Sequence, residues 1–331
     1  MLSAVGALHG SRALFARGAG GASEHTIFAA ASLSKLVVAA VALRLLEQQR
    51  LPSLELDVAA ALPSLRLHRR LSLRELLTHT SGLRDDESAL LPGRWRREGS
   101  DFVCPLSESC AGLLAELGPS AWASGPPPFS YHYSNMGMTL AAAALESVSD
   151  TQFSQLAREL VFAPLGMARS SFLLSESLAQ GGQLATPHGE DGAEMAHYCV
   201  AQYPAAGLRT TVSDFLLFVR AFTDAQSSFL TPESRAMMLP SSNVQGLGWW
   251  GADATYGEGL SADCAVWAHG GFMEGIRSHV FLWPASDAAL VYLQNGEALY
   301  GTHIAEAQRE IASLTGLPLS QLRIRRDPAS Y

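Results

Sequence analysis

Any fold proposed for this chain has to accommodate the stretch IFAAASLSKLVV at residues 27–38. It leads from a short apolar segment into a run whose apolar residues recur at helical spacing as far as Leu46. This periodicity predicts a helix from about Ser32 to Gln49 with one buried face. Because serine is common at helix starts, Ser32 by itself indicates no more than a helix cap.

The spacing of Ser32 and Lys35 adds a chemical possibility. Residues i and i+3 share one face of a helix, so the lysine amine can reach the serine hydroxyl. A helix N-terminus and burial both lower the pKa of a lysine, and a neutral amine is a general base for a serine nucleophile. Lys35 is also the only lysine in a chain with 23 basic residues. Arginine cannot replace it, because a guanidinium stays charged.

A second group, Tyr133-Ser134-Asn135, lies just before a predicted helix at residues 136–148. Such a tripeptide is often only a turn. A phenol close to a lysine ammonium, however, can have a lowered pKa and pass a proton to a leaving group. The amide of Asn135 can orient Lys35 and bind a substrate carbonyl. We therefore predict Tyr133 as a proton shuttle and Asn135 as a substrate-binding residue.

A third group, His269-Gly270-Gly271, lies between two predicted strands, where a histidine followed by two glycines is often only a tight turn. Its glycines would let a substrate lie along a strand edge and would expose backbone donors. An oxyanion hole needs two such donors, and we predict the backbone amides of Ser32 and Phe272. His269 is expected to hydrogen-bond the substrate or Tyr133.

Composition excludes several classes of partner. The net charge is −8 and no basic, aromatic-rich stretch is present, so nucleic acid is not expected. No apolar run is long enough to span a bilayer, and the first twenty residues do not resemble a secretion signal, which favours a cytoplasmic protein. Four cysteines without a Cys-x-x-Cys pair, and no His-Glu-x-x-His, argue against a metal or cofactor. Cys104 and Cys110 could pair only in an oxidising compartment.

Strands are predicted near both ends of the chain and helices between them. The fold class is therefore α/β (α+β), an antiparallel sheet flanked by helices with an inserted all-helical domain. The predicted sheet domain comprises residues 1–65 and 205–331, and the mainly helical domain residues 66–204. Within the latter, residues 84–130 are irregular and rich in proline, which is typical of an active-site insertion.

In this order, the Ser-x-x-Lys, Tyr-x-Asn and His-Gly-Gly groups resemble the penicillin-binding and serine β-lactamase superfamily. The class C-like branch is the most similar; it includes family VIII carboxylesterases, D-aminopeptidases and DD-carboxypeptidases. The resemblance covers residues 26–295. Four more sequence motifs of that branch occur here, namely Leu77-Thr78-His79-Thr80-Ser81-Gly82-Leu83, Pro164-Leu165-Gly166-Met167, Ala206-Gly207-Leu208 and Gly246-Leu247-Gly248-Trp249.

The resemblance implies a site at the junction of a sheet domain and a helical domain. It implies Ser32 as nucleophile, Lys35 as its base and Tyr133 as proton shuttle. In class C β-lactamases a lysine occupies the position of His269 and helps to hold a substrate carboxylate. The histidine favours a carboxylesterase acting on small esters. The alternatives are a D-amino-acid peptidase or DD-carboxypeptidase, a weak β-lactamase, an acyltransferase, or a binding homologue without turnover; the oligomeric state is left open.

Overall fold

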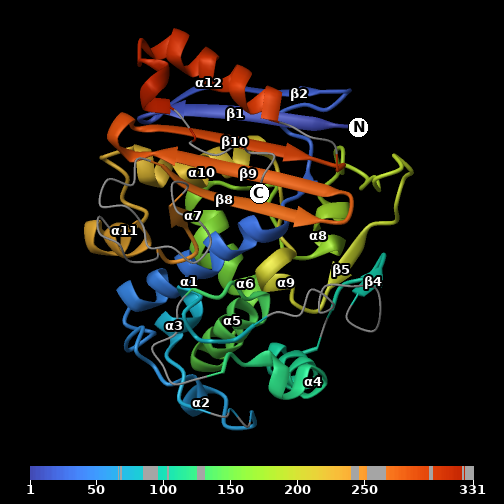
Figure 1. The fold of residues 1–331 in the computed structure, drawn as a ribbon, viewed down its shortest axis with the longest axis vertical. Helices are drawn as coiled ribbons and strands as arrows, with labels where there is room; N and C mark the ends of the chain where they lie inside the picture. The colour runs from blue at the N-terminus through green and yellow to red at the C-terminus, as the bar shows by residue number, and fades with distance from the viewer. Residues whose placement is uncertain are drawn as a thin grey trace.

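The computed structural model describes residues 1–65, 67, 69–84, 96–102, 104–124, 131–239, 246–251, 266–297, 301–322 and 324. Within these residues the main sheet is antiparallel and has six strands in the order β2-β1-β10-β9-β8-β7 (Figure 1). The strands are β1 (Ser3–His9), β2 (Arg12–Ala19), β7 (Trp250–Gly251), β8 (Trp267–Met273), β9 (Ile276–Trp283) and β10 (Ala288–Gln294). The predicted fold class is confirmed.

Both ends of the chain contribute to this sheet. The N-terminal hairpin turns at Gly10, which has a φ of 59°, a conformation that glycine adopts without a steric penalty. Strand β1 then pairs with the C-terminal strand β10, from Ser3 opposite Gln294 to His9 opposite Ala288. Leu2 and Asn295, which are 293 residues apart in the sequence, are therefore neighbours.

Helices cover both faces of the sheet. The contacts of β1 show both faces, because successive side chains of a strand point to opposite faces of the sheet. A β-carbon at Gly6 would lie 2.7 Å from Leu216 Cδ1 of α10 (Val212–Thr223), so glycine lets this helix approach closely. Its neighbour Ala7 belongs to the apolar cluster on the other face, which includes Ile304 and Ile311 of α12 (Gly301–Thr315).

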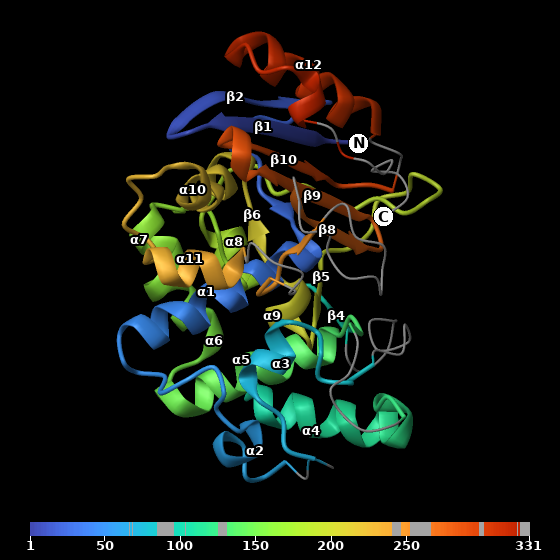
Figure 2. The same ribbon diagram turned by 60° about the vertical axis from the view of Figure 1, so that its left-hand side comes forward.

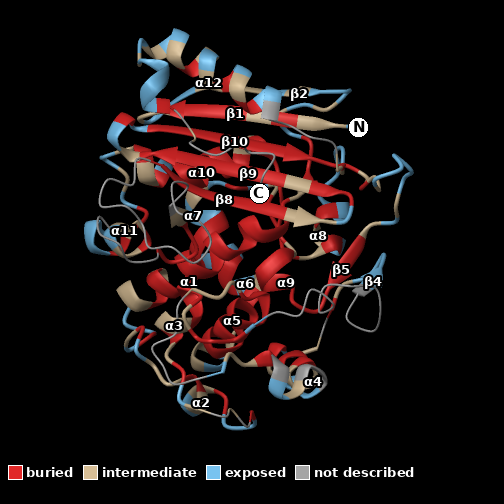
Figure 3. Cartoon of the chain, viewed as in Figure 1, coloured by how far each residue is buried: buried red, intermediate tan, exposed pale blue. Residues whose placement is uncertain are grey.

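Helix α1 (Ser34–Glu47) lies at the centre of the molecule. The prediction of one buried face was too narrow, because every residue from Ser34 to Leu43 is buried (Figure 3). Helices α5 (Asn135–Ser149), α6 (Phe153–Ala157) and α9 (Tyr203–Ala206) contact it. A helix surrounded in this way needs apolar or internally bonded side chains on all sides.

Helices α2 to α5 form the other end of the molecule. Figures 1 and 2 both place the sheet and α12 at one end and α2 to α5 at the opposite end. The smaller elements are α2 (Val58–Ala61), α3 (Leu73–Leu77), α4 (Leu106–Leu117), α7 (Ala163–Leu165), α8 (Leu174–Ala179), α11 (Pro232–Met238), β3 (Phe28–Ala29), β4 (Arg96–Glu98), β5 (Tyr198–Val200) and β6 (Arg209–Thr210). The helices of the described residues all fall short of the length and apolar character that a membrane span requires.

The predicted insertion at residues 84–130 is described in part. Its strand β4 pairs with β5, and its helix α4 packs against α5. Residues 85–95, 103 and 125–130 of this prediction lie outside the described residues. The domain boundaries at residues 65/66 and 204/205 stay predictions.

Candidate active site

Ser32, the predicted nucleophile, lies in a short 3₁₀ turn, Ala31–Leu33, that leads directly into α1 and is called the nucleophile turn below. Ala31 has a φ of 43°, which is uncommon for a residue with a side chain. Ser34 holds this turn, because its hydroxyl donates to Ala31 O at 2.5 Å and accepts from Leu208 N at 2.9 Å. The turn leaves Ser32 8% exposed at the start of the helix.

Lys35 is fully buried one turn further along. Its Nζ lies 2.9 Å from Ser32 Oγ, 2.6 Å from Asn135 Oδ1 and 2.8 Å from Ala205 O. The amide and backbone oxygens can only accept, so each takes one amine proton. In a neutral amine, the lone pair would then face Ser32 Oγ. This is the geometry that a base needs for removing the hydroxyl proton.

Tyr133 approaches the same oxygen from a distant part of the chain. Its hydroxyl donates to Ser32 Oγ at 2.8 Å, and Lys35 Nζ lies 4.8 Å from the centroid of its ring. Ser134 caps α5 by accepting from Gly137 N, so Asn135 becomes the first residue of that helix. Ser32, Lys35, Tyr133 and Asn135 therefore converge, while their catalytic roles stay predictions.

His269-Gly270-Gly271 was predicted to lie between two strands, and this placement was wrong. These residues lie inside β8 and pair with Val280, His279 and Ser278 of β9. Glycine is tolerated in the strand because another backbone approaches it. A β-carbon at Gly271 would lie 2.6 Å from Ala30 O and 3.0 Å from Ser32 N.

This close approach brings the edge of β8 against the nucleophile turn. In the described residues, β7 pairs with β8 only opposite Trp267 and Ala268. The edge of β8 from His269 to Met273 is thus not paired with β7. Phe272 follows Gly271 directly, and its amide stays our predicted second oxyanion donor.

His269 is buried, and its ring stacks on Trp250 with centroids 4.2 Å apart. Its Nδ1 lies 2.9 Å from Gly270 O. A carbonyl can only accept, so Nδ1 carries the proton and Nε2 has a free lone pair. Within the described part of the chain, Nε2 has no hydrogen-bond partner. Burial first, and the charge of Lys35 second, hold the pKa of His269 well below its usual range, so the ring is neutral.

Sequence reasoning missed two aromatic neighbours of Tyr133. The ring of His79 lies 4.7 Å from that of Tyr133, and the ring of Trp250 lies 6.5 Å from it. In the sequence, His79 stands out only as a member of the motif at residues 77–83, and no motif includes Trp250. The presence of a histidine in that motif was the one available signal.

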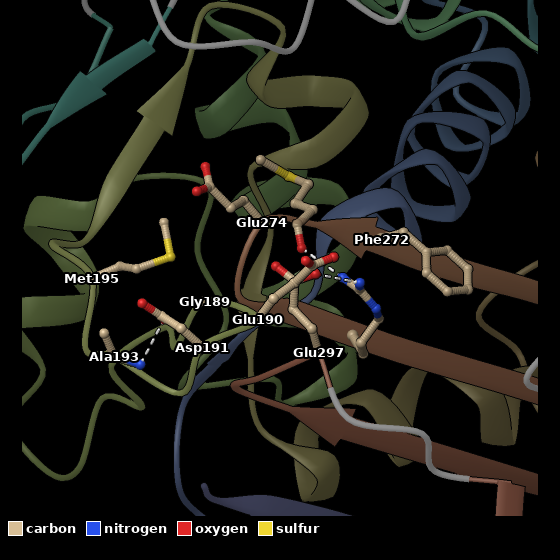
Figure 4. A pocket seen from close by; sticks show the side chains of 10 residues that line it. Gly189, Glu190, Asp191, Ala193, Met195, Phe272, Glu274 and Glu297 are labelled. Carbon is tan, nitrogen blue, oxygen red and sulfur yellow. Dashed lines mark hydrogen bonds and ion pairs between the residues drawn. The ribbon is translucent and has the colours of Figure 1, made fainter.

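A pocket of about 730 Å³ lies at the end of β8. Of the described residues that line it, four are acidic, namely Glu190, Asp191, Glu274 and Glu297, and one, Arg277, is basic (Figure 4). Arg277 is ion-paired to Glu297 at 2.8 Å. Phe272 of β8 also lines the pocket, so the pocket adjoins the strand that lies beside Ser32.

No group of histidine, cysteine or acidic side chains in the described residues could hold a metal ion. Cys104, Cys110 and Cys199 are free thiols, and Cys104 Sγ lies 3.1 Å from Ser109 Oγ. Cys264 lies outside the described residues.

The model of the Beta-lactamase family matches residues 3–313. The chain belongs to this family. The β-lactamase-family chain is 27% identical over 257 residues to a D-aminopeptidase of Cereibacter sphaeroides, a match that covers 73% of this chain and 45% of the relative. It therefore spans less than half the length of that relative.

Two solved structures share the fold of this β-lactamase-family chain. The octameric penicillin-binding protein homologue from Pyrococcus abyssi has a TM-score of 0.74 at 18% identity, covering 96% of this chain and 74% of its own. A class C β-lactamase from Rhodobacter sphaeroides has a TM-score of 0.71 at 18% identity, covering 95% and 94%. The predicted superfamily is confirmed.

Proposed function

We propose that this chain is a serine hydrolase that cleaves small esters through an acyl-enzyme on Ser32. One observation carries the proposal: Ser32 Oγ lies within hydrogen-bond distance of both Lys35 Nζ, at 2.9 Å, and Tyr133 Oη, at 2.8 Å. A hydroxyl between an amine and a phenol has both a base for its own proton and an acid for a leaving group.

The reaction follows from this arrangement. Lys35 takes the proton of Ser32 as Oγ bonds to the ester carbonyl carbon, and the carbonyl oxygen becomes an oxyanion held by the amides of Ser32 and Phe272. The bond to the alcohol oxygen then breaks, Tyr133 gives that oxygen a proton, and the proton on Lys35 restores the phenol. Water repeats these steps on the acyl-enzyme and releases the carboxylic acid.

The charges around the site favour an uncharged substrate. His269 is neutral, so it cannot hold a carboxylate as a lysine would. Arg277, on the neighbouring strand, is already ion-paired to Glu297. Penicillins and peptides with a free C-terminus carry a carboxylate, whereas simple esters do not.

A second candidate is hydrolysis of amides of D-amino acids. The pocket at the end of β8 favours it, because the carboxylates of Glu190, Asp191 and Glu274 would attract a substrate ammonium group (Figure 4). The D-aminopeptidase name of a relative points to the same class of substrate.

The test is a parallel panel of p-nitrophenyl butyrate, nitrocefin, and the p-nitroanilides of D-alanine and L-alanine. We expect the ester to be cleaved fastest, and a fluorophosphonate to add to Ser32 in the intact mass. Ser32→Ala should abolish turnover and the adduct, because it removes the attacking oxygen. Ser147→Ala, at an exposed serine of α5, is the matched control. Undiminished turnover by Ser32→Ala would disprove the proposal, and a preference for the D-anilide would select the second candidate.

A further inference from the structure

His79 lies against Tyr133 but contacts neither Ser32 nor Lys35 by a hydrogen bond that the structure shows. We propose that His79 is a positioning residue: a neutral imidazole that holds Tyr133 so that its hydroxyl points at Ser32. The inference rests on the proposed function, in which Tyr133 moves the proton. In this inference His79 affects catalysis only through the position of Tyr133.

The backbone on either side of Tyr133 is bonded to His79. The carbonyl oxygen of His79 accepts from His132 N at 2.8 Å, and its Nδ1 accepts from Ser134 N at 3.1 Å. The imidazole ring of His79 also packs against the ring of Tyr133, with centroids 4.7 Å apart and planes inclined by 32°. One residue thus fixes the preceding peptide, the following peptide and the ring of Tyr133.

The backbone of His79 explains how one residue makes all three contacts. It has a φ of 56°, two residues after the end of α3 at Leu77. This left-handed conformation is rare for residues with a side chain, although histidine and asparagine adopt it more often than most. It turns both the carbonyl and the ring of His79 toward the segment 132–134. Strained backbone of this kind persists where the surrounding contacts require it.

The protonation state of His79 suits this role. Because Nδ1 accepts from Ser134 N, the proton of the neutral ring is on Nε2. Burial first, and the charge of Lys35 second, lower the pKa of His79 to about 3. At neutral pH the ring therefore keeps the lone pair that Ser134 uses. A second proton would break this bond and place another cation near Lys35.

A double-mutant cycle separates positioning from general packing. His79→Asn keeps an acceptor near the Nδ1 position and tolerates a positive φ, but it removes the ring that covers Tyr133. We expect kcat for ethyl butyrate, whose alkoxide must be protonated, to fall by about 10- to 100-fold. The loss should be smaller with p-nitrophenyl butyrate, which has a better leaving group. His132→Asn, the same substitution one residue before Tyr133, is the matched control and should leave kcat unchanged.

In a Tyr133→Phe background, His79→Asn should reduce kcat by less than about twofold, because the group it positions is gone. An equal loss in both backgrounds would show that His79 only supports the fold, and would overturn the inference. The proposed function would stand in that case if Tyr133→Phe itself were strongly impaired. If Tyr133→Phe turns over ethyl butyrate as fast as the native protein, the shuttle is wrong and the role of His79 falls with it.

Nitrogen NMR of the unchanged protein provides a test that does not depend on a variant folding. With ¹⁵N-histidine we expect His79 to carry its proton on Nε2 and none on Nδ1, between about pH 5 and pH 8. A protonated Nδ1 in this range would overturn the inference, because the bond from Ser134 N could not form.

Discussion

At the scale of single residues, the proposed acylation of Ser32 depends on Lys35. It is buried and bonded to Ser32, Asn135 and the backbone of Ala205, so a large change in its shape or charge cannot be absorbed by solvent. A lysine can give up its proton in such a place, whereas an arginine cannot.

We therefore predict that Lys35→Arg lowers kcat for p-nitrophenyl butyrate by about 10³-fold, the usual effect of losing a general base. The measurement is steady-state kinetics, with circular dichroism to show that the variant is folded. Arg50→Lys, the reverse exchange at an exposed position, should keep full activity. A folded Lys35→Arg variant with activity close to that of the native protein would exclude Lys35 as the base.

At the scale of elements, the site depends on how closely β8 approaches the turn before α1. Gly271 permits this approach, since a β-carbon there would meet Ala30 O at 2.6 Å and Ser278 Oγ at 2.2 Å. The first of these is backbone, which cannot move aside as a flexible side chain can. Ser278 also donates to Ala30 O at 2.7 Å, so the same contact joins β9 to the nucleophile turn.

Gly271→Ala should therefore push β8 away from Ser32 N and weaken the predicted oxyanion hole. We expect kcat to fall by about 10²-fold, comparable to the loss of one oxyanion donor. Gly270→Ala is the informative comparison, because the atoms nearest to its β-carbon would belong to the side chains of His279 and Phe272 on the other side of the strand. Equal losses of kcat in the two variants would argue against a specific role for the Gly271 contact.

For the whole molecule, the buried histidines with lowered pKa values, His79, His269 and His279, connect stability to pH. Burial lowers the pKa of His79 and of His279 to about 3. In the unfolded chain a histidine titrates near pH 6.5. Between these values the unfolded state binds more protons, so each histidine favours unfolding as the pH falls.

We predict that the free energy of unfolding decreases below about pH 6.5, by about 1.4 kcal/mol per pH unit for each of these histidines. Urea unfolding at several pH values measures it. Glu146 acts in the opposite direction, because burial raises the pKa of its carboxyl group. The decisive quantity is therefore the difference between the native protein and His279→Gln, which should lose part of the dependence. Two parallel curves would contradict the prediction.

The features that could be predicted from the sequence are those with a local or periodic basis. The strands near both ends of the chain and the helix that follows Ser32 show in the spacing of apolar and turn residues. The proximity of Ser32 and Lys35 also follows from spacing, since a helix brings residues i and i+3 to one face. The order of the Ser-x-x-Lys, Tyr-x-Asn and His-Gly-Gly groups along the chain indicated the family.

The tertiary structure alone decided which distant groups meet. Nothing periodic in the sequence shows that His79 would cover Tyr133, or that Ala205 would accept a bond from Lys35. The placement of His269-Gly270-Gly271 between two strands failed for the same reason, because glycine in a strand is explained only by the backbone of Ala30 that lies against it. Local spacing depends on the geometry of one element, whereas these contacts depend on how separate elements pack.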